Sequence, residues 1–238
     1  MMISVENLVK RYDGHTVLDC LNFTVEEGDL FGFLGPNGAG KTTMIRILTA
    51  VLRADSGNLI IDGYDVSSEP LGVRRIINAL PESNGYYEWM TAREYLEFFA
   101  GLYEHKGPRQ ETDELLEAVG LQERKNNLIR TFSRGMRQRL GIARALINKP
   151  KVLFLDEPTN GLDPAGRRDV LELLMTLNRE RGMTLFLSTH LLDDVERLCN
   201  RVAIINYGKI VREGSLDKVK GKRTLEDTFL FSTKDGGQ

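Results

Sequence analysis

The sequence contains few cysteines and histidines, and this scarcity narrows the kinds of site it can form. Its 2 cysteines, Cys20 and Cys199, lie far apart and make no C-x-x-C pair, so a disulfide has no support. The 3 histidines, His15, His105 and His190, have no metal-ligand spacing. We therefore expect no metal site built from these residues, and we expect both cysteines to be buried thiols in a reducing cytosol.

The chain also lacks a strong net charge and a long hydrophobic run. Its formal net charge is −2 and its basic residues are scattered among acidic ones, so nucleic acid is not favoured as a partner. No apolar run approaches the roughly 18 residues that cross a bilayer, and we expect no signal peptide. With 41% hydrophobic residues, we expect one compact cytoplasmic domain with room for an inserted lobe.

What the sequence does contain is a glycine-rich stretch with the spacing G-x-x-x-x-G-K-[ST]. Residues 30–34 before it are typical of a buried strand, and residues 44–49 after it are typical of a helix. Such a loop turns consecutive N–H groups towards a phosphate at the positive end of the helix dipole. The stretch consists of Gly35, Pro36, Asn37, Gly38, Ala39, Gly40, Lys41, Thr42 and Thr43.

This stretch predicts a nucleotide-phosphate site. Lys41 would reach the β- and γ-phosphates, and the Thr42 hydroxyl would ligate Mg²⁺. The alternative is a glycine-rich turn that precedes Lys-Thr by chance, and the flanking strand and helix argue against it.

The rest of the chain alternates strand and helix patterns, which favours an α/β fold with a mostly parallel sheet and ligands at the carboxyl ends of its strands. Residues 91–146 have helical spacing, which indicates a helical lobe inserted at about residues 83–149. The tail from residue 218 is polar, although Leu225, Phe229 and Leu230 suit a short docked helix. Strands are expected at residues 3–12, 16–25, 58–63, 76–80, 152–155, 184–187 and 202–205.

Short local patterns mark where two helices begin and where one ends. Residues 91–94, Thr-Ala-Arg-Glu, predict a capping box at the start of the first helix of the lobe. Asp163-Pro164 predicts a helix with an aspartate cap and proline at its first position, and Gly182 predicts the end of that helix.

An acidic pair, Asp156-Glu157, follows the expected strand at residues 152–155. A carboxylate at the tip of a strand beside the phosphate loop suits Mg²⁺, usually through water, so we assign that role to Asp156. Glu157 would then orient or deprotonate the water that attacks the γ-phosphate. The alternative is a strand that exits into solvent with two hydrated acids.

Further motifs follow in the order found in a known family, the ATP-binding cassettes of ABC transporters. Residues 133–139 resemble its signature motif, residues 160–163 its D-loop, and residues 188–190 its switch-histidine region. Tyr12 falls where the family places an aromatic ring under the adenine. The resemblance spans roughly residues 3–215 and is specific, because unrelated phosphate-loop proteins lack the signature.

The resemblance implies the fold and its division into domains. It implies an α/β P-loop NTPase core with a mostly parallel sheet, an antiparallel β-edge subdomain and an inserted helical subdomain. The ATPase domain would occupy residues 1–217 and a short tail residues 218–238.

The same resemblance implies an Mg²⁺-dependent ATPase that acts with an integral membrane permease at the inner face of the membrane. Two copies would pack head to tail with ATP in the seam, so that Ser133 and Gly135 of one chain meet the γ-phosphate held by the other. His190 would donate to the γ-phosphate. From the residues alone, other readings stay open: Ser133 as an ordinary helix cap, His190 as a structural residue and Tyr12 as a packing residue.

Two departures from the family pattern concern the signature and the metal site. Phe132, Arg134 and Met136 stand where the family commonly shows Leu, Gly and Gln. Glu82 stands where most cassettes have a glutamine that meets Mg²⁺ and the transmembrane partner. Glutamate still offers oxygens to the metal. The Pro81-Glu82 pair looks like the branch of single-cassette ATPases that serve bacterial multidrug, antibiotic and ion exporters.

Three other functions share part of this pattern. A GTP switch would need N-K-x-D, whereas residues 148–151 are N-K-P-K. A small-molecule kinase would share the phosphate loop but would not need the signature motif. A stand-alone cassette in translation, DNA repair or cofactor assembly stays open. Those that act on the ribosome usually carry two cassettes in one chain and those that act on DNA a long coiled coil, and we expect neither here.

Overall fold

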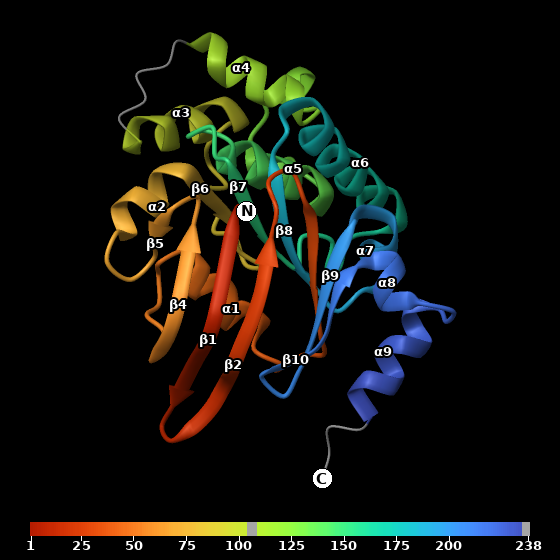
Figure 1. Cartoon of the computed structure of the whole chain (residues 1–238). Helices are drawn as coiled ribbons and strands as arrows, with labels where there is room; N and C mark the ends of the chain where they lie inside the picture. The colour runs from red at the N-terminus through yellow and green to blue at the C-terminus, as the bar shows by residue number, and fades with distance from the viewer. Residues whose placement is uncertain (104–108, 235–238) are drawn as a thin grey trace.

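The computed structural model describes residues 1–103 and 109–234, so His105 lies outside the described part of the chain (Figure 1). At its centre is a sheet with the strand order β10-β9-β3-β8-β7-β6. β10 runs antiparallel to β9 at one edge, and the other neighbouring pairs are parallel, as expected. The strands are β3 (Leu30–Leu34), β6 (Ile77–Leu80), β7 (Val152–Asp156), β8 (Thr184–Thr189), β9 (Arg201–Asn206) and β10 (Lys209–Ser215).

A second, antiparallel sheet has the order β2-β1-β4-β5 and confirms the expected β edge. Its first two strands are joined by the turn Asp13-Gly14, whose φ angles of 48° and 82° are the left-handed values that a tight hairpin turn needs. Its strands are β1 (Ile3–Tyr12), β2 (His15–Val25), β4 (Ser56–Ile61) and β5 (Tyr64–Asp65).

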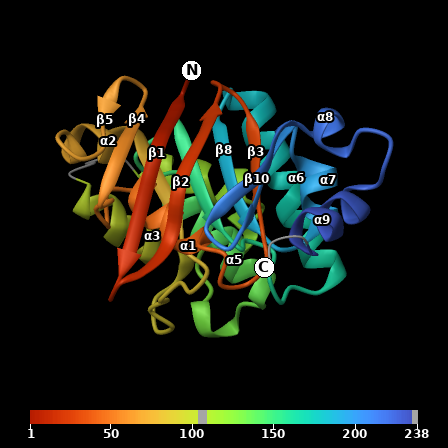
Figure 2. The ribbon, with the colours of Figure 1, turned by 60° about the horizontal axis from the view of Figure 1, so that its bottom comes forward.

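Both faces of the inner strands β3, β7, β8 and β9 are buried, which explains why these strands are mostly apolar runs. On β7, Val152 and Phe154 belong to a core cluster with the antiparallel sheet and α1 (Lys41–Leu48). The intervening Leu153 and Leu155 belong to the opposite cluster, with α6 (Pro164–Arg181) and α7 (Leu192–Leu198). Figure 2 shows the antiparallel sheet at the left and in front, and α6 and α7 at the right.

The helical lobe lies between β6 and β7 in the chain and forms the end of the molecule drawn at the top of Figure 1. The expected capping box is confirmed, because Glu94 N donates to Thr91 Oγ1 at 3.2 Å and Thr91 N donates to Glu94 Oε2 at 2.8 Å. The lobe consists of α3 (Ala92–Leu102), α4 (Arg109–Ala118), η1 (Gln122–Arg124), η2 (Ile129–Thr131) and α5 (Arg134–Ala145), and α2 (Pro70–Ile76) precedes it.

The described part of the tail is helical, with α8 (Leu216–Lys220) and α9 (Leu225–Lys234). The expected boundary after residue 217 lies inside α8. Leu225 is buried in the same core cluster as α6 and α7, Phe229 packs against that cluster, and Leu230 is exposed. Among the described residues, no helix has the length and apolarity that crossing a bilayer requires.

The expectation that both cysteines are buried is wrong for one of them. Cys20 lies on β2 and is exposed, because it is on the side of that strand turned away from the core. Cys199 is buried against Gly32 of β3, and burial raises the pKa of its thiol well above the ordinary value. Both are free thiols.

Candidate active site

Three neighbouring strands, β3, β8 and β7, end at the same edge of the parallel sheet and bring the expected motifs together. The phosphate loop follows β3, Asp156 ends β7, and His190 follows β8. Backbone hydrogen bonds join the loops, since Gly35 N donates to Thr189 O at 3.2 Å and Glu157 N donates to Ser188 O at 3.0 Å. Segments more than a hundred residues apart in sequence therefore form one site.

The phosphate loop has the curled backbone that its glycines predict. Gly40 has φ of 106°, and a Cβ there would lie 2.6 Å from Leu18 Cδ2, so a side chain at this position would be strained. A Cβ at Gly35 would lie 2.6 Å from Ile205 O. α1 begins at once after Gly40, and its first turn places N–H groups at the loop. This is the geometry of an anion site.

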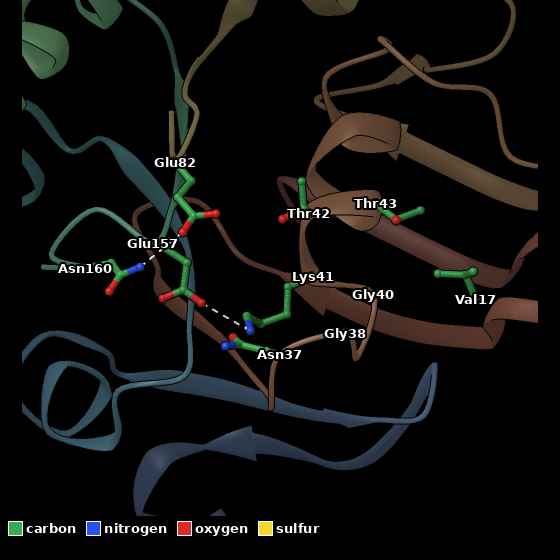
Figure 3. A pocket seen from close by; sticks show the side chains of 10 residues that line it. All are labelled: Val17, Asn37, Gly38, Gly40, Lys41, Thr42, Thr43, Glu82, Glu157 and Asn160. Carbon is green, nitrogen blue, oxygen red and sulfur yellow. Dashed lines mark hydrogen bonds and ion pairs between the residues drawn. The ribbon is translucent and has the colours of Figure 1, made fainter. Parts of the chain in front are cut away.

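Lys41 is the first residue of α1, and its side chain is only 6% exposed. Its ammonium donates hydrogen bonds to Gly35 O at 2.8 Å and Pro36 O at 3.2 Å. It also forms an ion pair with Glu157 Oε1 at 3.2 Å, drawn as a dashed line in Figure 3. The lysine thus lies inside the curl of the loop, where a phosphate would meet it.

Glu157 connects the lysine to the histidine. Its carboxylate lies between Lys41 and His190, whose Nδ1 is 2.9 Å from Glu157 Oε2. The residue is buried, and its φ of 48° is a left-handed value that side chains other than glycine rarely adopt. A buried acid needs charged or hydrogen-bonding partners, and these two side chains provide them.

A cavity of about 360 Å³ lies over the phosphate loop, and half of the expected site residues line it. Thr42 and Glu82 face it from opposite sides in Figure 3. Asn160 Nδ2 donates to Glu82 Oε1 at 3.1 Å across the cavity wall. The lining residues are Val17, Asn37, Gly38, Gly40, Lys41, Thr42, Thr43, Glu82, Glu157 and Asn160.

Two of these residues were not assigned to the site from sequence. Asn160 lies three residues after Glu157 in the D-loop segment, and that position was the available signal. Val17 comes from β2 of the antiparallel sheet, and nothing in its sequence surroundings points to the cavity.

The oxygen ligands expected for Mg²⁺ are not all on the cavity wall. Thr42 and Glu82 are, whereas Asp156 is buried behind it and accepts a hydrogen bond from Ser188 Oγ. Across the described chain, no group of three or more His, Cys, Asp or Glu side chains forms a ready metal site. Protein ligands to a cation here would thus be few, as Mg²⁺ sites with substrate phosphates usually are.

Tyr12, Ser133 and Gly135 do not line the cavity. Tyr12 ends β1, is 41% exposed, and has the Lys10 ammonium 5.3 Å from its ring centroid. Ser133 caps α5 by accepting from Met136 N at 3.2 Å. The contacts of Tyr12, Ser133 and Gly135 with nucleotide stay predictions.

Comparison with known proteins identifies the family. A model of the ABC transporter family matches residues 18–160. The bacitracin transport ATP-binding protein BcrA of Bacillus licheniformis is 43% identical over 235 residues, which cover 98% of this chain and 76% of BcrA. The linearmycin resistance ATP-binding protein LnrL of Bacillus subtilis (strain 168) is 39% identical over 237 residues, covering 99% of this chain and 76% of LnrL.

Solved structures agree with the sequence matches and with the expected P-loop NTPase fold. The structure of an ATP-binding subunit of an ABC transporter superposes with a TM-score of 0.83 at 29% identity, covering 98% of this chain and 99% of that one. A dimeric ATP-binding cassette in a post-hydrolysis state, bound to ADP and Pi, has a TM-score of 0.80 at 27% identity, with 90% and 99% covered. The chain belongs to the ABC transporter family, as a nucleotide-binding subunit that hydrolyses ATP.

Proposed function

We propose that this subunit powers export through a separate membrane permease, and that Glu157 is the base of its ATPase reaction. The export direction is supported by relatives named for bacitracin transport and linearmycin resistance. These names do not favour a stand-alone cytosolic ATPase. The observation that carries the catalytic part is the Glu157 carboxylate, which lies on the cavity wall between Lys41 Nζ and His190 Nδ1.

We assign roles to the other residues from the chemistry of their side chains and from the family resemblance. Backbone N–H groups of residues 35–43 and the Lys41 ammonium would bind the phosphates. His190 would donate to the γ-phosphate, and Glu157 would accept a proton from the attacking water. Tyr12, at the end of β1, would stack on the adenine.

Mg²⁺ would be held by the Thr42 hydroxyl, by Glu82 and, through water, by Asp156. The hydroxyl and carboxylate that face the cavity are the oxygen donors that this ion prefers. When bound, the ion neutralises charge on the transferred phosphate.

A second copy of the chain would complete the site. Ser133 and Gly135 begin a helix that does not reach the cavity of their own chain, yet their N–H groups are suited to an anion. In a head-to-tail homodimer they would meet the γ-phosphate bound by the other copy. The dimeric structure of the similar cassette with ADP and Pi supports the formation of a dimer.

The permease would dock beside the helical lobe. Large apolar side chains are exposed there, among them Leu71 on α2, Trp89 before α3 and Leu102 at the end of α3. Leu71 and Tyr103 line one groove together with two arginines of α2. Exposed apolar surface of this kind marks a protein interface.

Glu157→Gln tests the catalytic proposal. The amide keeps the size of the side chain but accepts no proton, so ATP binding should persist while turnover falls by about 10² to 10⁴. Binding of a fluorescent ATP analogue and release of Pi measure the two effects. Glu213→Gln is a matched control. Glu213 lies on β10, outside the cavity, and its carboxylate pairs with Arg201 at 3.4 Å, so this variant should hydrolyse ATP like the parent. Near-parental hydrolysis by Glu157→Gln would remove Glu157 from the reaction.

The same variant tests the permease. Because it should hold ATP without hydrolysing it, a tagged Glu157→Gln subunit should retain an integral membrane protein in detergent extracts when ATP is added. That protein should stimulate the ATPase activity of the parental subunit. If no membrane protein both co-purifies with the variant and stimulates the ATPase activity of the parental subunit, the proposal of a permease partner is wrong. The assignment of the chain as an ATPase still stands.

A further inference from the structure

A buried carboxylate lies behind the active site, outside the cavity. Asp194, on α7, is 0% exposed. Its Oδ1 accepts a hydrogen bond from Arg167 Nε at 2.6 Å, and its Oδ2 accepts one from Thr159 Oγ1. A carboxylate is removed from water at high cost unless such partners satisfy it, so these contacts define where all three side chains lie.

The two segments that Asp194 connects are those that carry the proposed catalytic pair. Thr159 follows Glu157 by two residues, and Asp194 follows His190 by four. The segments already touch through Glu157 Oε2 and His190 Nδ1, 2.9 Å apart. The bond between Thr159 and Asp194 is a second contact between the same segments, on the side away from the nucleotide cavity.

The third partner ties this contact to a long helix. Arg167 lies in the first turns of α6, where its N–H donates to Asp163 O at 2.9 Å. Its Nη2 also lies 3.7 Å from Asp193 Oδ2. The charged groups that face Asp194 therefore come from α6 and from its own helix.

The loop after β7 needs such an anchor because its backbone is strained at the catalytic position. Glu157 has a φ of 48°, and a residue with a side chain keeps this value only where its surroundings hold it. Backbone bonds restrain the loop through Glu157 N to Ser188 O at 3.0 Å and Asn160 N to Glu157 O at 3.1 Å. Thr159 adds a buried side-chain bond directly after the strained residue.

We propose that Asp194 is a positioning residue for ATP hydrolysis. Through Thr159 it holds the loop that carries Glu157, and through its own helix it holds the segment that carries His190, so that the two side chains stay in register. It acts through these residues and does not contact the nucleotide. The proposal rests on the catalytic role proposed above for Glu157.

Thr159→Val tests this role, with Thr159→Ser as the conservative partner. Valine has nearly the shape of threonine but donates no hydrogen bond to Asp194. Displacement of a catalytic group by about 1 Å lowers the rate by about 10², so kcat should fall by 10- to 100-fold. KM for ATP should stay unchanged, because the phosphate loop is not touched. Serine keeps the hydroxyl and should restore kcat.

Asp194→Asn and Asp29→Asn separate positioning from stability. Asp29 is likewise a buried acid near an arginine, with Oδ2 3.4 Å from Arg201 Nη1 and 2.8 Å from Glu26 N, and it lies before the opposite end of β3. Both variants should lower the melting temperature, but only Asp194→Asn should lower kcat.

The outcomes distinguish the positioning role of Asp194 from the catalytic role of Glu157 on which it rests. Parental kcat in Thr159→Val, or equal loss in Thr159→Val and Thr159→Ser, overturns the positioning role while Glu157 remains the base if Glu157→Gln is inactive. An active Glu157→Gln overturns both. Equal falls in kcat for Asp194→Asn and Asp29→Asn would show that the effect is loss of stability alone.

Discussion

Glu82 departs from the glutamine that most cassettes carry, and its contact with Asn160 indicates what the departure changes. Glu82 Oε1 accepts a hydrogen bond from Asn160 Nδ2 at 3.1 Å, and a glutamine oxygen would accept the same bond. The exchange of one residue for the other therefore alters charge at the cavity wall with little change in shape.

Glu82→Gln should leave ATP binding nearly unchanged and raise the Mg²⁺ concentration needed for half-maximal ATPase activity by about tenfold, because one anionic oxygen donor is lost. A Mg²⁺ series at saturating ATP measures this shift. With the permease present, the ratio of activity with and without it should also change.

Glu88→Gln is the control for that experiment. Glu88 lies six residues further on, outside the cavity, and pairs with Arg137 at 3.1 Å. Its removal should not move the Mg²⁺ series. Identical series for Glu82→Gln and the parent would make Glu82 an ordinary loop carboxylate.

At the scale of single elements, helix caps are the features that are best predicted from the sequence. The capping box at Thr91 and Glu94 and the cap at Asp163 are confirmed, because each depends on residues three positions apart. α2 and α7 were not predicted, since each has only seven residues and too few turns for a periodic pattern. β10 was missed because, as a largely exposed edge strand, it lacks a buried face.

The same limit applies to the site. The phosphate loop is predicted from the sequence because its function requires consecutive residues. The bonds from Asn160 to Glu82 and from Thr159 to Asp194 join residues 78 and 35 positions apart. No local pattern encodes such pairs, and only the register of β7 beside β8 brings the second pair together.

Thr91→Ala should destabilise the lobe without changing the site. Loss of a threonine cap costs about 1 kcal/mol of the free energy of unfolding, which lowers the melting temperature of a domain of this size by about 2–4 °C. KM for ATP should not change, because Thr91 is not part of the cavity. Thr91→Ser keeps the cap and should melt like the parent. If Thr91→Ala left the melting temperature unchanged, the capping box would not contribute to the stability of the protein.

At the scale of the whole molecule, the question is whether two chains share each site. Lys41 lines the cavity and Gly135 does not, although both are assigned to phosphate. A Cβ at Gly135 would lie 3.5 Å from Gly166 Cα, an ordinary contact, so Gly135→Asp should fold while placing a negative charge at the helix start. Lys41→Ala and Gly135→Asp should each be inactive as homodimers.

A mixture of these two variants should recover ATPase activity. In a mixed dimer one site carries both changes and the other carries none, provided that one intact site turns over alone. The recovered rate should rise with total protein concentration, because it depends on association. An inactive mixture in which crosslinking demonstrates mixed dimers would contradict independent shared sites. Full activity of Gly135→Asp alone would show that its helix never meets the nucleotide.

The strand order of the central sheet also sets the order in which a newly made chain can be completed. β3 ends at residue 34, whereas its neighbours β8 and β9 begin at residues 184 and 201. At about 5–20 residues per second, the ribosome needs roughly 8–30 s to make the chain between β3 and β8. During that time Phe31 has only early partners such as Phe23, whose ring centroid is 5.7 Å away in the finished protein. The first half of the chain thus leaves the ribosome with the buried strand β3 unpaired, and until β8 and β9 are made, the antiparallel sheet is the part of the core that can cover it.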